Sequence, residues 1–144
     1  MIFAEGGGRV IATSNTVNTT EYLYIIKRRV LTWFNSRHER DYIFQQDGAP
    51  AHTAQDSMDF LEERGIPQLN WPSGSPDLSP IENVWKLLKD ALGKRGCPKN
   101  VDELLSWVEN IWDDLCERHC PSLYASMDRR CEAVIANKGA HTKY

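Results

Sequence analysis

The amino-acid sequence predicts an α/β fold in which a mixed sheet is covered by helices. The prediction rests on two patterns. Short β-prone stretches alternate with segments of helical period in the first half of the chain, and three helical patterns follow one another in the second half. A chain of 144 residues is long enough for one core. We therefore expect a single domain over residues 1–144.

Local signals place the elements of the first half. The glycine run of residues 6–8 lies between the β-prone stretches MIF and RVIAT, which predicts a hairpin or strand pair. Asn18, with Glu21 three residues later, predicts the start of a helix that continues to about residue 36. The segment DYIFQQD predicts a strand that ends at Asp47, because Gly48 and Pro50 follow.

The second half begins with a helix predicted from about Thr53 to Glu63, followed by a short strand over residues 68–70. The segment WPSGSPDLSP predicts an extended loop that leads into a helix, for which Ser79 is the expected N-cap and Pro80 the first helical residue. Another helix is expected from Asn100. We expect the last helix to open at Pro121 and to end near residue 136, before a frayed tail.

Composition and charge narrow the class of protein. Hydrophobic residues make up 41% and charged residues 26%, an ordinary globular balance. No apolar run is long enough for a membrane span, so we expect a soluble intracellular protein without a membrane partner. The net charge of −3 does not supply the basic footprint of a protein that grips DNA by itself. Basic residues do cluster locally, at Lys86, Lys89, Lys94, Arg95 and Lys99. This cluster is either a solvated helix face and loop or a DNA contact.

The four cysteines indicate reduced thiols rather than a disulfide framework. Cys116, His119 and Cys120 lie close in sequence, but no second pair at a standard spacing accompanies them. We therefore favour buried or surface thiols over a zinc site.

Two carboxylates are candidates for chemistry. Asp47 ends a predicted strand, where ligand sites gather in open α/β sheets, and Glu82 lies 35 positions later in the first turn of a predicted helix. If the two side chains meet, their hard oxygen atoms suit Mg²⁺ or Mn²⁺. Two such ions about 3.5–4 Å apart can cut and join phosphodiesters.

Each candidate residue also has an alternative interpretation in which its role is purely structural. Glu82 fits a capping box with Ser79, and Asp47 before a glycine fits a turn aspartate. His52 would satisfy backbone groups near a helix start, and Asp77 would be an ordinary loop residue. A third carboxylate to bridge two metal ions is not evident in the sequence.

Two longer segments resemble a known family. QQDGAPAHTA (residues 45–54) and WPSGSPDLSPIENVWKLLK (residues 71–89) are similar to the two signature blocks of mariner-superfamily DDE transposases, in their order and in their 35-residue step. The specific part is residues 41–89. Residues 1–40 resemble the family more loosely, and residues 97–144 resemble it only in pattern.

The resemblance implies a ribonuclease-H-like fold, a pair of Mg²⁺ or Mn²⁺ ions, and cleavage and strand transfer at transposon ends in the nucleus. Asp47 would match the second carboxylate of the family and Glu82 the third, as catalytic and metal-binding residues. His52, Asn83 and Asp77 would be neighbours of the active site, with Lys86 and Lys89 as DNA contacts. DNA is the expected partner, together with a second copy of the chain in a homodimer.

The resemblance also sets expectations about what the chain lacks. The first carboxylate of the family lies on a strand that precedes the region matching Met1, and Glu5 is the only acid among residues 1–20. We therefore expect an N-terminally truncated catalytic domain, without that first strand and without the helix-turn-helix region of the family. Whether the chain is an active enzyme stays open at this point. The alternatives are an inactive or domesticated remnant that binds nucleic acid or protein, and another α/β phosphotransfer or nuclease domain with chance similarity.

Overall fold

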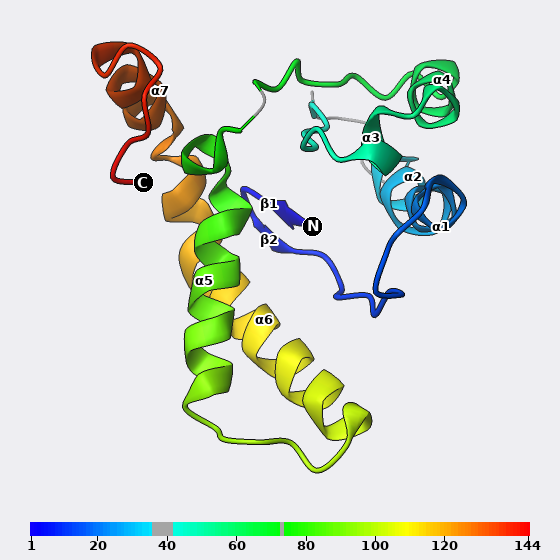
Figure 1. Cartoon of the computed structure of the whole chain (residues 1–144), viewed down its shortest axis with the longest axis vertical. Coiled ribbons are helices and arrows are strands. Elements are labelled where there is room, and N and C mark those ends of the chain that lie inside the picture. Colours follow the sequence, from blue (N-terminus) through cyan, green and yellow to red (C-terminus); the bar gives the residue numbers. More distant parts are fainter. Residues whose placement is uncertain (36–41, 73) are drawn as a thin grey trace. The chain divides into compact units, whose positions relative to one another are not determined.

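The computed structural model describes residues 1–35, 42–72 and 74–144, and these form two compact units. One unit combines Met1–Ala12 with Ser75–Tyr144, and we call it the α5–α6 unit. The other is Thr13–Gly74, which we call the α1–α4 unit. Figure 1 labels their helices and strands. The prediction of a single domain over residues 1–144 stays a prediction.

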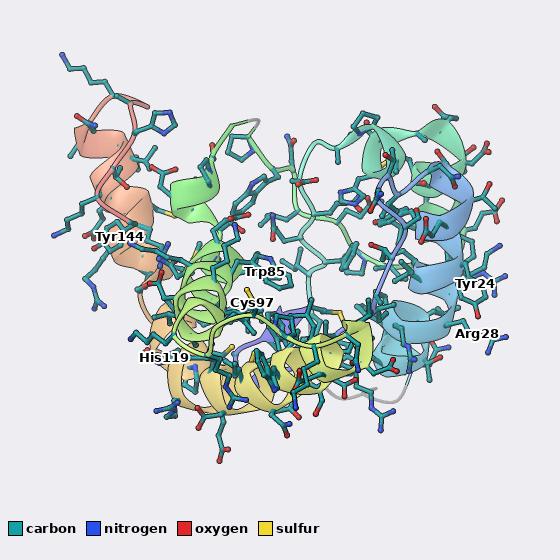
Figure 2. The ribbon with its side chains drawn as sticks, turned by 60° about the horizontal axis from the view of Figure 1, so that its bottom comes forward. Tyr24, Arg28, Trp85, Cys97, His119 and Tyr144 are labelled. Carbon is teal, nitrogen blue, oxygen red and sulfur yellow. The ribbon has the colours of Figure 1, made fainter. Side chains whose placement is uncertain are left out.

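The core of the α5–α6 unit lies between two long helices. Helix α5 (Pro80–Gly93) and helix α6 (Val101–Tyr124) run side by side as a helical hairpin (Figure 1). Val84 and Leu88 of α5 are buried against Trp112 and Leu115 of α6. The ring of Trp85, labelled in Figure 2, lies 4.8 Å from that of Trp112 between centroids. This packing fixes which face of α5 remains exposed.

A two-stranded hairpin covers part of α6. Strand β1 (Ile2–Phe3) pairs antiparallel with β2 (Gly6–Gly7), which confirms the predicted hairpin, although the second strand is made by the glycines rather than by RVIAT. A Cβ atom at Gly7 would lie 2.5 Å from the sulfur of Cys116, so only glycine fits against the helix here. The indole N–H of Trp112 donates to the Gly8 carbonyl at 2.8 Å.

Helix α6 starts where the sequence predicts, but it ends after Pro121, the residue at which the next helix was predicted to begin. The Asn100 side chain accepts from the Glu103 N–H at 2.8 Å, which confirms the predicted cap. The helix then continues through Pro121, so the prediction that the last helix opens there is wrong. Buried Cys120 and the bond from the Tyr124 hydroxyl to the Ile2 carbonyl hold the chain helical across the proline, at the expense of one backbone bond. Helix α7 begins at Met127 and ends at Ala136.

The C-terminal tail is anchored, so the prediction of a frayed tail is wrong. The Asn137 side-chain amide donates to the Ala140 and His141 carbonyls, at 3.2 and 2.7 Å. The Thr142 N–H donates to the Asp77 carboxylate at 3.0 Å. Polar partners, rather than apolar burial, hold this segment, which is why hydrophobic periodicity gave no sign of it.

The α1–α4 unit begins with the predicted helix, interrupted by a wider turn. Helix α1 (Thr19–Ile25) passes through a π-helical segment, η1 (Ile26–Val30), into α2 (Leu31–Asn35). The Asn18 side chain accepts from the Glu21 N–H, as predicted, but the Glu21 carboxylate binds the Ser14 N–H instead of closing a capping box. The helix predicted from about Thr53 to Glu63 is confirmed as α4 (Gln55–Glu63), and a short helix, α3 (Pro50–Thr53), precedes it.

The strands predicted around residues 44 and 68 reduce to a single parallel bridge between Phe44 and Gln68 within the described residues. The Phe44 N–H donates to the Pro67 carbonyl, and the Leu69 N–H donates to the Phe44 carbonyl. The start of the predicted strand, Asp41, lies outside the described residues. After Phe44 the chain is polar, and its side chains bond to neighbouring elements instead of extending a ladder. In the described ranges, no helix is long and apolar enough to cross a membrane.

Candidate metal-binding carboxylates

Asp47 is held by contacts within its own loop. Its Oδ1 atom accepts from the Ala49 N–H at 3.0 Å and lies 2.6 Å from Nδ1 of His52. The side chain is nevertheless 70% exposed. Asp47 is therefore a turn aspartate, as one structural reading proposed, and its Oδ2 atom still has no bonding partner among the described residues of its unit. That oxygen is available to a ligand.

The Gln46 side chain connects the segment around Asp47 to neighbouring elements of the same unit. Its side-chain carbonyl accepts from the Tyr22 hydroxyl of α1, and its amide donates to the His52 carbonyl and to the Gln68 side chain, both at 3.3 Å. The Tyr22 ring also contacts the His52 ring at a tilt, with ring centroids 4.4 Å apart. Burial and the charge of Asp47 raise the pKa of Tyr22, so its hydroxyl stays a neutral donor. Gln46 and Tyr22 were missed as site residues, although Gln46 stands within the QQD signature.

Glu82 lies in the first turn of α5 and is exposed. Ser79 occupies the N-cap position, but its hydroxyl makes no capping bond, and only its backbone carbonyl accepts from the Glu82 N–H at 3.2 Å. Ser79 is therefore the N-cap residue of α5, as predicted, but its side chain does not form the bond of a capping box with Glu82. No described residue of the same unit binds the Glu82 carboxylate, which leaves both of its oxygens available.

Asp77 and Asn83 converge on a residue that the sequence did not single out. Arg130 of α7 is 2% exposed. Its guanidinium donates to the Asp77 carbonyl and to the Asn83 side-chain oxygen, each at 2.7 Å. Asp77 itself is buried, and its carboxylate accepts from the Thr142 N–H. Burial alone would raise the pKa of Asp77, but the hydrogen bonds from Thr142 outweigh it and hold the pKa below its ordinary value.

Lys86 and Lys89 are both exposed on α5. They follow Glu82 by four and seven positions, which is the spacing of one helical face. The carboxylate and the two predicted DNA contacts thus share the side of α5 that the core leaves uncovered.

The cysteine pair belongs to the core of α6. Cys116 and Cys120 are buried, and burial raises the pKa of the Cys116 thiol to about 12, so it stays protonated. Across residues 1–35, 42–72 and 74–144, no group of three or more His, Cys, Asp or Glu side chains is arranged to hold a metal ion. The structure joins His52 to Asp47, and Asp77 and Asn83 to Arg130, while Asp47 and Glu82 belong to different units.

The fold matches solved transposase catalytic domains. The crystal structure of the catalytic domain of Mos1 mariner transposase superposes with a TM-score of 0.80 at 20% identity, over 97% of this chain and 72% of that one. The same domain with raltegravir and Mg gives a TM-score of 0.79 at 21% identity, over 97% and 73% of the two chains. The Mos1 paired end complex with Mn gives 0.78 at 21% identity, over 99% and 43%. The chain therefore has the ribonuclease-H-like fold of that class, which confirms the predicted fold class and its helical C-terminal end.

The sequence comparisons give the family. The model of the DDE superfamily endonucleases matches residues 1–105, and the chain belongs to this family. The transposable element Tc1 transposase of Caenorhabditis elegans is 36% identical over 124 residues, covering 86% of this chain and 45% of that protein. The Tcb1 transposase of Caenorhabditis briggsae is 35% identical over 130 residues, covering 90% and 47%. The chain thus spans about half the length of these curated relatives.

Proposed function

We propose that this chain contributes Asp47 and Glu82 to the active site of a DNA transposase that cuts transposon ends and joins them to target DNA. Both acids lie in the part that matches the family model. The observation that carries the proposal is that both carboxylates keep oxygens free for a ligand. Asp77, the other acid of the second signature segment, is instead buried and bound by Thr142.

The donor chemistry of the two residues fits a hard divalent cation. Exposed carboxylate oxygens are the ligands that Mg²⁺ and Mn²⁺ take, whereas buried thiols such as Cys116 favour softer metals. Asp47 and Glu82 would hold the ions, and a bound pair would activate the attacking oxygen and stabilise the leaving one. His52 and Ala49 fix the direction of the Asp47 carboxylate through its Oδ1 atom, which leaves Oδ2 for the metal.

DNA is the substrate that this proposal implies. Lys86 and Lys89 stand on the Glu82 face of α5, where their ammonium groups would meet phosphates next to the reacting strand. Solved Mos1 structures include a pre-cleavage transpososome and a strand transfer complex. By analogy, we propose that the intact protein acts in the nucleus on two transposon ends, with a second copy of the chain.

Metal-dependent nicking tests the assignment. The intact protein is incubated with Mn²⁺ and a supercoiled plasmid that carries the DNA flanking the coding sequence in its genome. Asp47→Ala and Glu82→Ala should each lower nicking on the order of a hundredfold or more, because a lost metal ligand removes several kcal/mol of transition-state stabilisation.

Two exposed acids that lie a few residues after Asp47 and Glu82 in the sequence serve as matched controls. Asp56→Ala on α4 and Asp90→Ala on α5 should nick like the wild type. If Asp47→Ala or Glu82→Ala also nicks like the wild type, the site assignment is wrong. If the wild-type protein neither nicks DNA nor binds Mn²⁺, an inactive remnant describes it better.

A further inference from the structure

The first turn of α5 begins with a proline, and its Glu82 N–H donates to the Ser79 carbonyl, but it has no side-chain cap. Ser79 provides no side-chain cap, and the preceding residues form only a short 3-10 turn, η2 (Pro76–Leu78). A helix end without a side-chain cap frays unless something else holds it. Glu82 stands in this turn. Because a metal ligand needs a fixed direction, contacts from outside the turn that add rigidity would favour metal binding.

Arg130 supplies contacts on both sides of this helix start. One terminal nitrogen of its guanidinium donates to the Asp77 carbonyl in η2, and the other donates to Asn83 in α5. Its Nε atom donates to the Ser126 hydroxyl at 2.8 Å, which anchors the arginine at the start of its own helix. The planar guanidinium has a rigid fork of donors, so the three bonds fix three elements relative to one another.

The C-terminal tail closes over this arginine. The Tyr144 ring, labelled in Figure 2, lies 5.0 Å from the guanidinium carbon of Arg130, and the Thr142 N–H binds the Asp77 carboxylate. Burying a charged guanidinium is costly, and an apolar side chain of similar volume often stabilises a fold as well or better. Burial lowers the pKa of Arg130, in keeping with that cost. The buried guanidinium of Arg130 is therefore better explained by a role in positioning its hydrogen-bond partners than by a gain in stability.

We propose that Arg130 is a positioning residue for Glu82. Its guanidinium holds the side chain of Asn83, which neighbours Glu82 in the same helical turn, and so fixes the rotation of that turn and the direction of the carboxylate. This inference rests on the proposed function for the metal-binding role of Glu82. The bracing of the helix start itself does not depend on any metal.

The first test uses the metal-free intact protein. Hydrogen exchange of the backbone amides is measured over residues 79–88 in the wild type, Arg130→Met, Arg130→Lys and Arg129→Met. Arg129 is exposed beside Arg130 and provides the matched control. Exchange in the first turn of α5 should be roughly tenfold faster in Arg130→Met, because charge-assisted hydrogen bonds are lost. It should be intermediate in Arg130→Lys and unchanged in Arg129→Met.

The second test separates positioning from general stability. Mn²⁺ binding is titrated by calorimetry, and Arg130→Met should weaken it roughly tenfold, the effect expected for a residue that orients a metal ligand. Trp107→Ala, which removes a half-buried ring elsewhere in the same unit, should lower thermal stability without changing Mn²⁺ affinity. Should Arg130→Met fail to fold, Arg130→Lys decides by the same two measurements.

Unchanged exchange and unchanged Mn²⁺ affinity in the folded arginine variants would overturn the inference. If Glu82→Ala abolishes nicking while the arginine variants behave like the wild type, only this inference fails and the proposed function stands. If Glu82→Ala leaves nicking and Mn²⁺ affinity intact, the proposed function fails, whatever the exchange rates show.

Discussion

The two carboxylates are held in contrasting ways. Asp47 depends on its own loop, because its Oδ1 atom bonds to groups only two and five residues further along the chain. The turn that carries Glu82 depends on distant residues, since Arg130 is 47 positions from Asn83 and Thr142 is 65 from Asp77. Hydrogen bonds between residues close in sequence can be predicted from a signature segment. Hydrogen bonds between residues far apart in sequence form only when the fold brings those residues together. Substitutions should therefore affect the two regions by different routes.

The largest expected effect is on the α5–α6 unit. Trp112→Ala should lower the free energy of unfolding by about 3–5 kcal/mol, because this ring is 1% exposed and its loss leaves a cavity under α5. Urea denaturation followed by circular dichroism measures the change. Trp107→Ala, on the same helix but only half-buried, should cost clearly less. Equal losses for the two variants would mean that the long-range core does not determine the stability of this unit.

A smaller effect is expected in the Asp47 loop. His52→Ala removes the imidazole 2.6 Å from the Asp47 carboxylate and should slow metal-dependent nicking roughly tenfold, as expected when a metal ligand loses its orienting partner. Stability should change little, because His52 is only half-buried. Gln55→Ala, an exposed neighbour bonded to Asp59, is the control. Wild-type nicking by His52→Ala would show that the loop holds Asp47 without the histidine.

The smallest effects compare the two helix starts of the α5–α6 unit. Asn100→Ala should lower the unfolding free energy by about 1 kcal/mol, since its side chain caps α6. Ser79→Ala should cost less than about 0.5 kcal/mol, because its hydroxyl caps nothing. Thermal unfolding of both variants checks this order. A larger loss at Ser79 would indicate that the start of α5 relies on local capping after all.

Sequence reasoning predicted the starts of the capped helices well, but it predicted the strands around residues 44 and 68, the last helix and the polar contacts less well. The helices around Asn18 and Asn100 start where their capping residues predict, because capping is a local interaction. Pro121 misled the prediction, since tertiary packing outweighs the cost of a proline inside α6.

The candidate site was predictable only where it lies in a signature segment. Asp47, His52 and Glu82 come from such segments, and the structure joins the first two by a direct contact. Arg130 gave no signal, because one arginine in a polar helix looks like any solvated residue until α7 packs against η2. Tyr22 likewise has nothing in the sequence that separates it from the other apolar residues of its helix, although its hydroxyl binds Gln46.

The most direct test of the convergence of Asp47 and Glu82 is a crystal structure of the intact protein with Mn²⁺, whose anomalous scattering locates the ions. We predict that both carboxylates bind the manganese, with neighbouring ions about 3.5–4 Å apart. Manganese bound elsewhere, with the carboxylates of Asp47 and Glu82 more than about 10 Å apart, would contradict the account, since one two-metal site cannot span that distance.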